Sequence, residues 1–319
     1  MRVLLTGGAG FVGQWLARAL LARGDDVDVT GLGDKFSGPP VLSADERRRI
    51  RWMAADVRDS EEIDFAVERS RPDLIFHLAG VSFPPDAERS PTTAYDINAL
   101  GAVRLLTSVR RRLMAGEIDP VVVVIGSGMQ YGMHAAAAMP LAETAAQRPL
   151  TMYAASKAAQ ELAALQFYRS SAVRVVCTRS FNHSGAGHGE QYLLPSLVAR
   201  AVAARKTGAA RLLLGNDVVR DYLHVSDVVD AYLRLAAHGT AGEAYNVASG
   251  VGVSVRQLAA SVLLRVGVSA DISGDPSLVR ATDIPVLIGS PAKLERDTGW
   301  HPSRTHADII DDLLHAATD

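Results

Sequence analysis

The sequence has little cysteine, no long apolar run and no surplus of charge of either sign. Among its 319 residues Cys177 is the single cysteine, so an intrachain disulfide is excluded and a cytoplasmic location is expected. The 33 basic and 35 acidic side chains give a net charge of -2, which argues against nucleic acid or an anionic membrane as a partner. No apolar run approaches the roughly 18 residues of a membrane-spanning helix. The chain is therefore expected to be a globular protein of about two domains.

Cysteine and metal chemistry are not expected. Cys177 lies within an apolar run, which is typical of a buried and inert thiol. His183 and His188 share a glycine-rich segment, but no further Cys or His is clustered there. We therefore predict no metal site.

Short apolar runs alternate with longer amphipathic stretches in the first half of the chain. The runs are rich in Val, Leu and Ile without alternation, which is typical of strands buried on both faces of a parallel sheet. They occupy residues 3–5, 27–30, 74–78, 121–125 and 173–178. Residues 11–23, 91–115 and 151–170 are expected to be helices. This order predicts an α/β fold, a doubly wound Rossmann sheet with helices on both faces.

The pattern loosens after about residue 180. Residues 182–191 contain several glycines and no periodicity, so we expect a loop. We interpret residues 1–179 as one domain and residues 180–319 mainly as a smaller, partly interleaved lobe. Parts of 218–255 are expected to return to the first domain. Further elements are expected at residues 192–206, 211–214, 225–237, 244–247 and 253–266.

A glycine-rich turn follows the first predicted strand directly. Residues 6–13 read T-G-G-A-G-F-V-G, which contains G-x-x-G-x-x-G and opens the first predicted helix. Glycines here permit a tight turn and close approach of the backbone to a pyrophosphate, and the helix N-terminus offers free N–H groups. In this context the motif predicts NAD(P) binding by Gly7, Gly10, Phe11, Val12 and Gly13.

The sequence does not decide between NAD and NADP. Gly31 stands where an acid would bind the adenosine ribose, and Asp34 and Lys35 just after it favour opposite cofactors. Asp56, next to Val57, has two open interpretations. It accepts a hydrogen bond from the adenine amino group, or it is simply an acid at a helix N-terminus.

A Y-x-x-x-K motif supplies the candidate catalytic groups. Tyr153 and Lys157 are four residues apart and share one face of a predicted helix. The lysine is expected to lower the pKa of the tyrosine, which would then exchange a proton with a sugar oxygen. Ser127 follows the strand at 121–125 and is placed to bind the same oxygen.

Ser127, Tyr153 and Lys157 downstream of the glycine turn resemble the extended short-chain dehydrogenase/reductase family. The resemblance continues in F-H-L-A-G at 76–80, Asn98, R-D-Y-L-H-V-S-D at 220–227, R-A-T-D at 280–283 and G-W-H-P at 299–302. It implies that Leu78, Ala79 and Asn98 belong to the cofactor site. It also implies that Arg220 and Arg280 bind the diphosphate of a nucleotide sugar, and that the protein is a homodimer formed through two surface helices.

The resemblance also narrows the reaction. R-S-F-N-H-S-G-A-G at 179–187 and Y-L-L-P-S at 192–196 resemble members that act on GDP-linked hexoses, with Asn182, His183 and Leu194 at the substrate. This implies reduction by NAD(P)H at C4 of a GDP-linked 4-keto-6-deoxy-hexose.

Three alternatives to a reductase are open. A 4,6-dehydratase is disfavoured because Met129 replaces the family's proton-transferring Glu, and methionine cannot move a proton. A 4-epimerase uses the same three catalytic groups but retains its cofactor. A non-catalytic NAD(P)-sensing regulator is the alternative from another class of protein.

Overall fold

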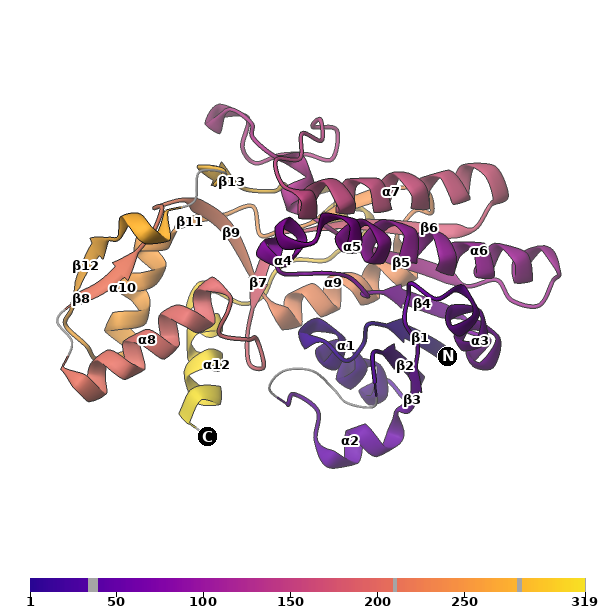
Figure 1. Ribbon diagram of the computed structural model, residues 1–319, viewed down its shortest axis with the longest axis horizontal. Coiled ribbons are helices and arrows are strands. Elements are labelled where there is room, and N and C mark those ends of the chain that lie inside the picture. The colour runs from indigo at the N-terminus through magenta and orange to yellow at the C-terminus, as the bar shows by residue number, and fades with distance from the viewer. Residues whose placement is uncertain (34–39, 209–210, 280–282, 319) are drawn as a thin grey trace.

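The computed structural model describes residues 1–33, 40–208, 211–279 and 283–318. Three predicted binding residues, Asp34, Lys35 and Arg280, lie outside these ranges. In the described part the chain forms a large parallel sheet covered by helices on both faces, with a smaller lobe beside it (Figure 1). The predicted doubly wound α/β fold is confirmed.

Seven parallel strands form the main sheet in the order β10-β6-β5-β4-β1-β2-β3. The order reverses between β1 and β4, and ligands of such sheets bind beyond the strand ends at that point. The strands are β1 (Arg2–Thr6), β2 (Asp26–Gly31), β3 (Arg51–Ala54), β4 (Leu74–His77), β5 (Val121–Ser127), β6 (Arg174–Ser180) and β10 (Ala244–Val247).

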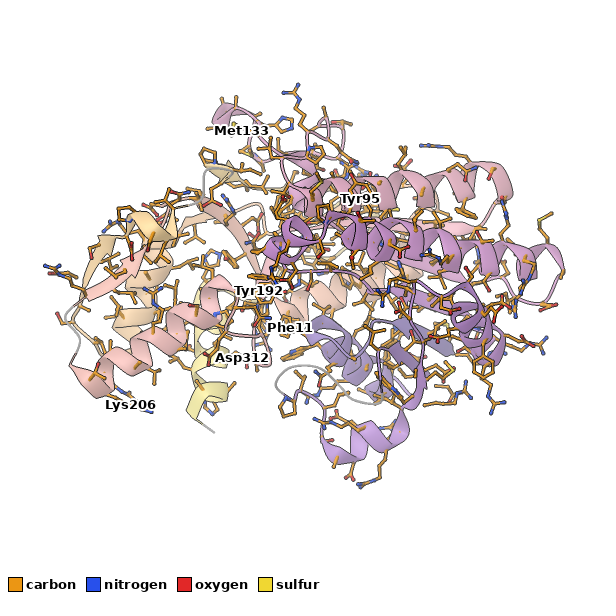
Figure 2. The ribbon with its side chains drawn as sticks, in the orientation of Figure 1. Phe11, Tyr95, Met133, Tyr192, Lys206 and Asp312 are labelled. Atoms are coloured by element: carbon orange, nitrogen blue, oxygen red, sulfur yellow. The ribbon has the colours of Figure 1, made fainter. Side chains whose placement is uncertain are left out.

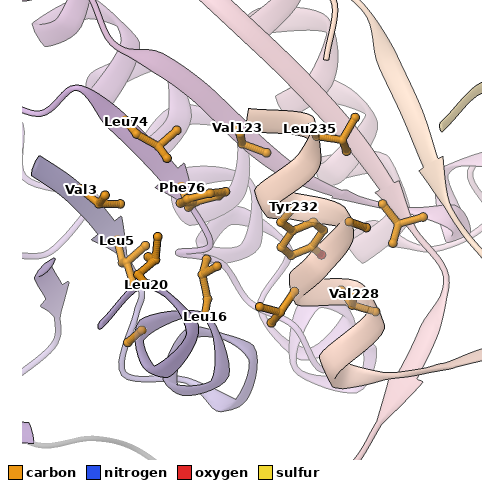
Figure 3. Packing of buried hydrophobic residues seen from close by; sticks show 14 of the residues in the cluster. Val3, Leu5, Leu16, Leu20, Leu74, Phe76, Val123, Val228, Tyr232 and Leu235 are labelled. Carbon is orange, nitrogen blue, oxygen red and sulfur yellow. The ribbon is translucent and has the colours of Figure 1, made fainter. Parts of the chain in front are cut away.

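Helices cover both faces because each strand buries side chains on both sides. On one face Phe76 and Val123 pack against helices α1 and α9, with Leu16, Tyr232 and Leu235 between them (Figure 3). The other face buries a second cluster. The helices of the first face are α1 (Phe11–Ala22), α9 (Val225–His238) and α11 (Ala292–Thr298), with α2 (Ala44–Arg49) beside α1; those of the second are α3 (Ser60–Ser70), α6 (Gly101–Met114) and α7 (Met152–Ser171).

The predicted helix at 91–115 is interrupted in its middle. It consists of α5 (Pro91–Tyr95), one π-helical turn (Asp96–Leu100) and α6, and a further short helix, α4 (Pro84–Arg89), precedes it. Such single π turns are frequent at functional sites. Asn98 lies in this turn.

The smaller lobe is built on β9 (Val219–His224). It pairs with β7 (Asn182–Ser184), β11 (Gly252–Ser254) and β13 (Val286–Leu287), while β8 (Arg211–Leu214) pairs with β12 (Asp271–Gly274). Helices α8 (Leu193–Thr207), α10 (Val255–Val266) and α12 (His306–Thr318) bury its core. The prediction of a loop over 182–191 is therefore wrong at its start, because residues 182–184 pair with β9.

Two later segments pack against the first sheet. Strand β10 pairs with β6 at the sheet edge, and α9 contacts α1. Trp300 is wholly buried in the same core and donates from Nε1 to the carbonyl oxygen of Asp227 at 3.0 Å. Short 3-10 turns occupy Gly128–Tyr131, Ala136–Ala138 and Pro276–Leu278.

Candidate active site

A cavity of about 1470 Å³ opens where the two lobes meet. It is lined by the glycine turn, the carboxyl ends of the main strands and the first residues of the smaller lobe. Phe11 and Tyr192 lie at this junction (Figure 2). Sixteen of the predicted site residues line it, and these are Gly7, Gly10, Phe11, Val12, Gly13, Asp56, Val57, Leu78, Ala79, Ser127, Tyr153, Lys157, Asn182, His183, Leu194 and Arg220.

The glycine turn leaves the N-terminus of α1 open toward the cavity. Gly10 is the N-cap residue, and no side chain caps the first turn. Gly7 has a φ of 68°, and a Cβ at this residue would lie 2.5 Å from Cα of Ala79, so the turn requires glycine. Free N–H groups at a helix N-terminus bind phosphate. These features fit the pyrophosphate of a dinucleotide.

Asp56 lines the cavity beside the glycine turn and forms an ion pair with Arg58. The Arg58 NH2 group lies 2.6 Å from Oδ2 of Asp56. Hydrogen bonds from the side chain and the backbone of Arg58 lower the pKa of the Asp56 carboxyl group. Helix α3 is capped by Asp59, which accepts from the backbone N–H of Glu61 at 2.8 Å. Asp56 is therefore not the N-cap acid of α3.

Ser127 and Tyr153 meet at the cavity wall. Ser127 is the N-cap of the 3-10 turn after β5, and its Oγ accepts from the backbone N–H of Met129 at 3.2 Å. Both side chains line the cavity, and interaction with the Ser127 side chain acts to lower the pKa of the Tyr153 hydroxyl group. Burial has the larger effect and raises this pKa overall. Tyr153 is therefore protonated at neutral pH and can donate its proton.

Lys157 lies one turn after Tyr153 on α7 and is buried. Its Nζ donates to the carbonyl oxygen of Ile125 and to Oε1 of Gln160, both at 2.9 Å, and burial lowers its pKa to about 8. The net pKa of Tyr153 is raised in this structure, and not lowered as the sequence led us to expect. The lysine is held by Ile125 and Gln160, and burial of the phenol dominates.

Asn98 is placed behind the cavity rather than in its lining. Its Oδ1 accepts from the backbone N–H of Val81 at 2.8 Å, and its Nδ2 donates to Oγ of Ser156 at 2.8 Å. Asn98 therefore connects the loop after β4 with α7, the helix that carries Tyr153.

The smaller lobe contributes polar groups from β7 and β9. Nδ1 of His183 lies 2.9 Å from the carbonyl oxygen of Phe181, and burial lowers the pKa of the imidazole. Arg220 is half-buried, and its NH1 group donates to the carbonyl oxygens of Val219 and Ile284 at 2.9 and 2.5 Å. Leu194 supplies an apolar wall from α8.

A stack of rings joins the two lobes, and the sequence analysis missed it. The ring of His188 lies 4.5 Å from that of Phe11 and 4.2 Å from that of Tyr192, with both pairs stacked. The hydroxyl group of Tyr192 is 2.9 Å from Oγ of Ser82. The pKa of His188 is lowered to about 3, mainly by burial and to a smaller extent by His183. The available signal was the presence of bulky rings in two glycine-rich segments.

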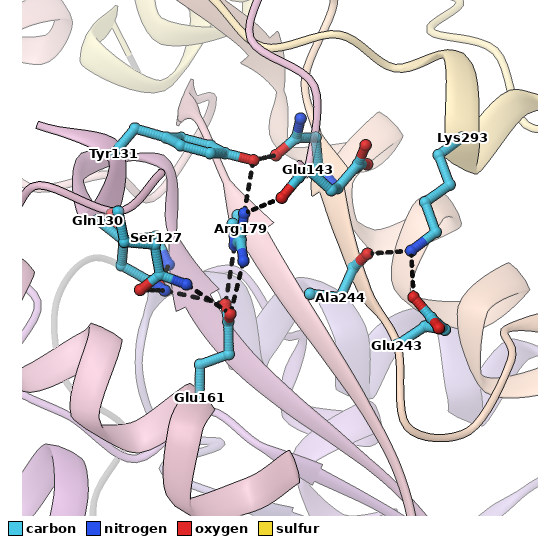
Figure 4. Close-up of polar contacts among 11 residues, drawn as sticks. Ser127, Gln130, Tyr131, Glu143, Glu161, Arg179, Glu243, Ala244 and Lys293 are labelled. Atoms are coloured by element: carbon cyan, nitrogen blue, oxygen red, sulfur yellow. Dashed lines mark hydrogen bonds and ion pairs between the residues drawn. The ribbon is translucent and has the colours of Figure 1, made fainter. Parts of the chain in front are cut away.

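A buried ion pair behind the site was also missed (Figure 4). Arg179 on β6 donates to Glu161 on α7 through Nε at 2.9 Å and NH2 at 2.7 Å, and both side chains are buried. Burial lowers the pKa of Arg179, but bonding to Glu161 raises it above its ordinary value overall. The available signal was the spacing, because Glu161 lies four residues after Lys157 on the same helix face.

Three expectations concern other chemistry. Cys177 is buried, as predicted, and burial raises the pKa of its thiol well above the ordinary value. Within the described ranges, no group of three or more His, Cys, Asp or Glu is arranged to hold a metal ion. Over the same ranges, no helix combines the length and apolarity needed to cross a membrane.

A parallel Rossmann sheet with an open glycine turn and a Ser, Tyr and Lys site at the strand ends defines an extended short-chain dehydrogenase/reductase. The family model described as GDP-mannose 4,6 dehydratase matches residues 4–313. Because this match spans nearly the whole chain, the protein belongs to that family.

Individual relatives give the same assignment. The chain is 39% identical to GDP-6-deoxy-D-mannose reductase of Pseudomonas aeruginosa over 237 residues, which are 73% of this chain and 76% of the relative. It is 30% identical to GDP-6-deoxy-D-talose 4-dehydrogenase of Aggregatibacter actinomycetemcomitans over 302 residues, 92% and 90% of the two chains. A solved structure of RMD from P. aeruginosa complexed with NADPH superposes with a TM-score of 0.82 at 31% identity, covering 100% of both chains.

Proposed function

We propose that the protein is a nucleotide-sugar 4-ketoreductase that uses NAD(P)H to reduce C4 of a GDP-linked 4-keto-6-deoxy-hexose. The observation that carries the proposal is that Ser127, Tyr153 and Lys157 line one cavity together with the glycine turn and Arg220. Similarity to the GDP-6-deoxy-D-mannose reductase and to the NADPH-bound RMD supports both the GDP-sugar substrate and the cofactor.

The cofactor site would use the open N-terminus of α1 for the pyrophosphate. Asp56 and Val57 would contact the adenine, and Leu78 and Ala79 would lie along the dinucleotide. When bound, NAD(P)H supplies a hydride to C4 of the sugar. We propose that residues 1–179, with the returning α9 and β10, form the domain that holds it.

The proton comes from this chain. Tyr153 is protonated at neutral pH and would donate to the oxygen at C4 as negative charge develops there, while Ser127 holds the same oxygen. Lys157 would stabilise the phenolate that remains. Its ammonium is already buried one turn away from Tyr153 and is held by Ile125.

The substrate would lie across the smaller lobe. Arg220 and Arg280 would bind the diphosphate, because a planar guanidinium group binds two oxygens at once. Asn182, His183 and Leu194 would contact the sugar and nucleotide. Met129 lines the cavity beside Ser127. This apolar residue at the position of the proton-transferring Glu supports reduction over dehydration.

The experiment is incubation with NADPH or NADH and the 4-keto-6-deoxy sugars of GDP, dTDP and UDP, followed by NMR of the product. The proposal expects stoichiometric oxidation of the cofactor with the GDP sugar. Interconversion of C4 epimers without net cofactor consumption would indicate an epimerase. Cofactor binding without turnover of any sugar would indicate a regulator.

We further propose a cytoplasmic homodimer. The buried thiol of Cys177 suits a reducing compartment. Met114 on α6 and Leu162 on α7 are 79% and 67% exposed, and these two helices contact each other on one face of the molecule. A monomer mass in light scattering at micromolar concentration would contradict the dimer.

A further inference from the structure

The two groups that would hold the substrate oxygen come from different elements. Ser127 ends β5 and begins a 3-10 turn, whereas Tyr153 lies near the start of α7. Their relative position sets the geometry of proton donation, so a contact that joins the turn to the helix has consequences for catalysis.

Gln130 makes such a contact. Its Oε1 accepts from the backbone N–H of Ser127 at 2.8 Å, and its Nε2 donates to Oε2 of Glu161 at 2.9 Å. Gln130 is wholly buried, and Glu161 lies about two turns after Tyr153 on α7. One side chain therefore connects the backbone of Ser127 to the helix that carries Tyr153.

Glu161, the residue to which Gln130 donates, is itself held in place by other side chains. Arg179 donates twice to Glu161 and once to the hydroxyl group of Tyr131 at 2.9 Å, and Tyr131 donates to Oδ1 of Asn246 at 2.7 Å. These contacts tie α7 to β6 and β10 (Figure 4). Glu161 therefore has little freedom to follow a shift of Gln130.

Gly126, near the end of β5, leaves room for the side-chain amide of Gln130. A Cβ at Gly126 would lie 2.6 Å from Oε1 of Gln130 and 2.2 Å from the carbonyl oxygen of Thr178. A larger residue at 126 would collide with the oxygen that binds the N–H of Ser127. The glycine thus permits the close approach on which the connection depends.

We propose that Gln130 is a positioning residue for Ser127, acting from the Glu161–Arg179 ion pair. The inference deepens the proposed function and rests on it. Gln130 touches neither substrate nor cofactor in this role. It fixes the backbone of Ser127, and the Oγ of Ser127 is further oriented by the N–H of Met129.

The test compares Gln130→Met with Gln147→Met. Gln147 donates from Nε2 to Oε1 of the same Glu161 carboxylate at 2.6 Å, and it lies on the loop before α7 rather than in the turn of Ser127. Gln130→Met is expected to lower kcat about tenfold to a hundredfold, because small misplacements of reacting groups have effects of that size. The KM for the sugar and the Kd for the cofactor should stay within about twofold, as should kcat of Gln147→Met. Equal losses of kcat in the two variants would overturn the proposal.

A double-mutant cycle with Ser127→Ala separates positioning from a general loss of structure. If Gln130 acts through Ser127, then Gln130→Met changes kcat of the Ser127→Ala enzyme by less than about twofold. A full, multiplicative loss in that background would contradict positioning. Thermal unfolding of all four proteins shows that the comparison is between folded enzymes.

Failure of the proposed function is distinguishable from failure of this inference. If the wild-type protein turns over a different nucleotide sugar, the reductase proposal fails and the same cycle is run with that sugar. If it turns over none, hydrogen–deuterium exchange of the Ser127 amide decides the inference. Exchange must accelerate in Gln130→Met and not in Gln147→Met, and equal exchange in both would overturn it.

Discussion

Tyr153 is the residue on which the proposed reaction depends most, because its hydroxyl group is the proposed proton donor. Tyr153→Phe keeps the ring and removes the proton, so kcat should fall about 10²–10⁴-fold. The change is measured as NADPH oxidation with the GDP-linked keto sugar. Tyr168→Phe, on the same helix and 38% exposed, is the matched control and should retain full activity. Near-normal turnover of Tyr153→Phe would refute the assignment.

The charge of Lys157 should give the proposed reaction an alkaline limit. Burial lowers the pKa of this amine to about 8, so above pH 8 the enzyme loses the positive charge that would stabilise the phenolate. Tyr153 has a raised pKa and remains protonated over the same range. We therefore expect kcat/KM to fall as pH rises through about 8. A pH profile of the free enzyme measures this, and Lys157→Met should lack the decline. A wild-type profile that is flat to pH 9.5 would contradict the account.

At the scale of elements, the sequence predicts what depends on local spacing. The glycine turn and the Tyr153–Lys157 pair lie within one turn or helix, so their geometry follows from neighbouring residues. Pairings between distant segments are decided by packing, so they could not be predicted from local sequence patterns. The edge strand β10 joins β6 after more than 60 residues. The bond from Gln130 to Glu161 spans 31 residues, and no local pattern encodes it.

Trp300, near the C-terminus, packs in the core of the main sheet, and we expect it to contribute strongly to stability. Trp300 is wholly buried between α9 and α11. Trp300→Ala would leave a cavity and remove the Nε1 hydrogen bond to Asp227, so the free energy of unfolding should fall by about 3–5 kcal/mol. Urea denaturation followed by circular dichroism measures it. Phe65→Ala, at a side chain 60% exposed, should change the value by less than about 0.5 kcal/mol. A similar loss in both variants would show that Trp300 is not a core residue.

At the scale of the whole molecule, the cavity lies between the two lobes, and hydrogen bonds connect the lobes beside it. Trp15 on α1 donates to the carbonyl oxygen of Ala186 at 2.9 Å. Asp312 on α12 accepts from the N–H of Ala186 at 2.7 Å and contacts His224. The segment after β7 is therefore held by both lobes. A dinucleotide bound beneath it would contact each of them.

Cofactor binding should therefore stabilise the whole molecule. A dinucleotide at a hundred times its Kd adds about 2.7 kcal/mol to the free energy of unfolding. Thermal unfolding with NADPH and with NADH measures this, and the larger shift identifies the preferred cofactor. Absence of any shift with either dinucleotide at millimolar concentration would contradict the cofactor site.

The most direct test of the central claim follows one labelled atom. The enzyme is incubated with GDP-linked 4-keto-6-deoxy-mannose and NAD(P)H carrying deuterium at the transferable C4 position of the nicotinamide, and the sugar product is examined by NMR. The account predicts one oxidised cofactor per sugar, with deuterium only at C4 of a single GDP-6-deoxy-hexose epimer. Unlabelled product, or sugar consumed without cofactor oxidation, would contradict it.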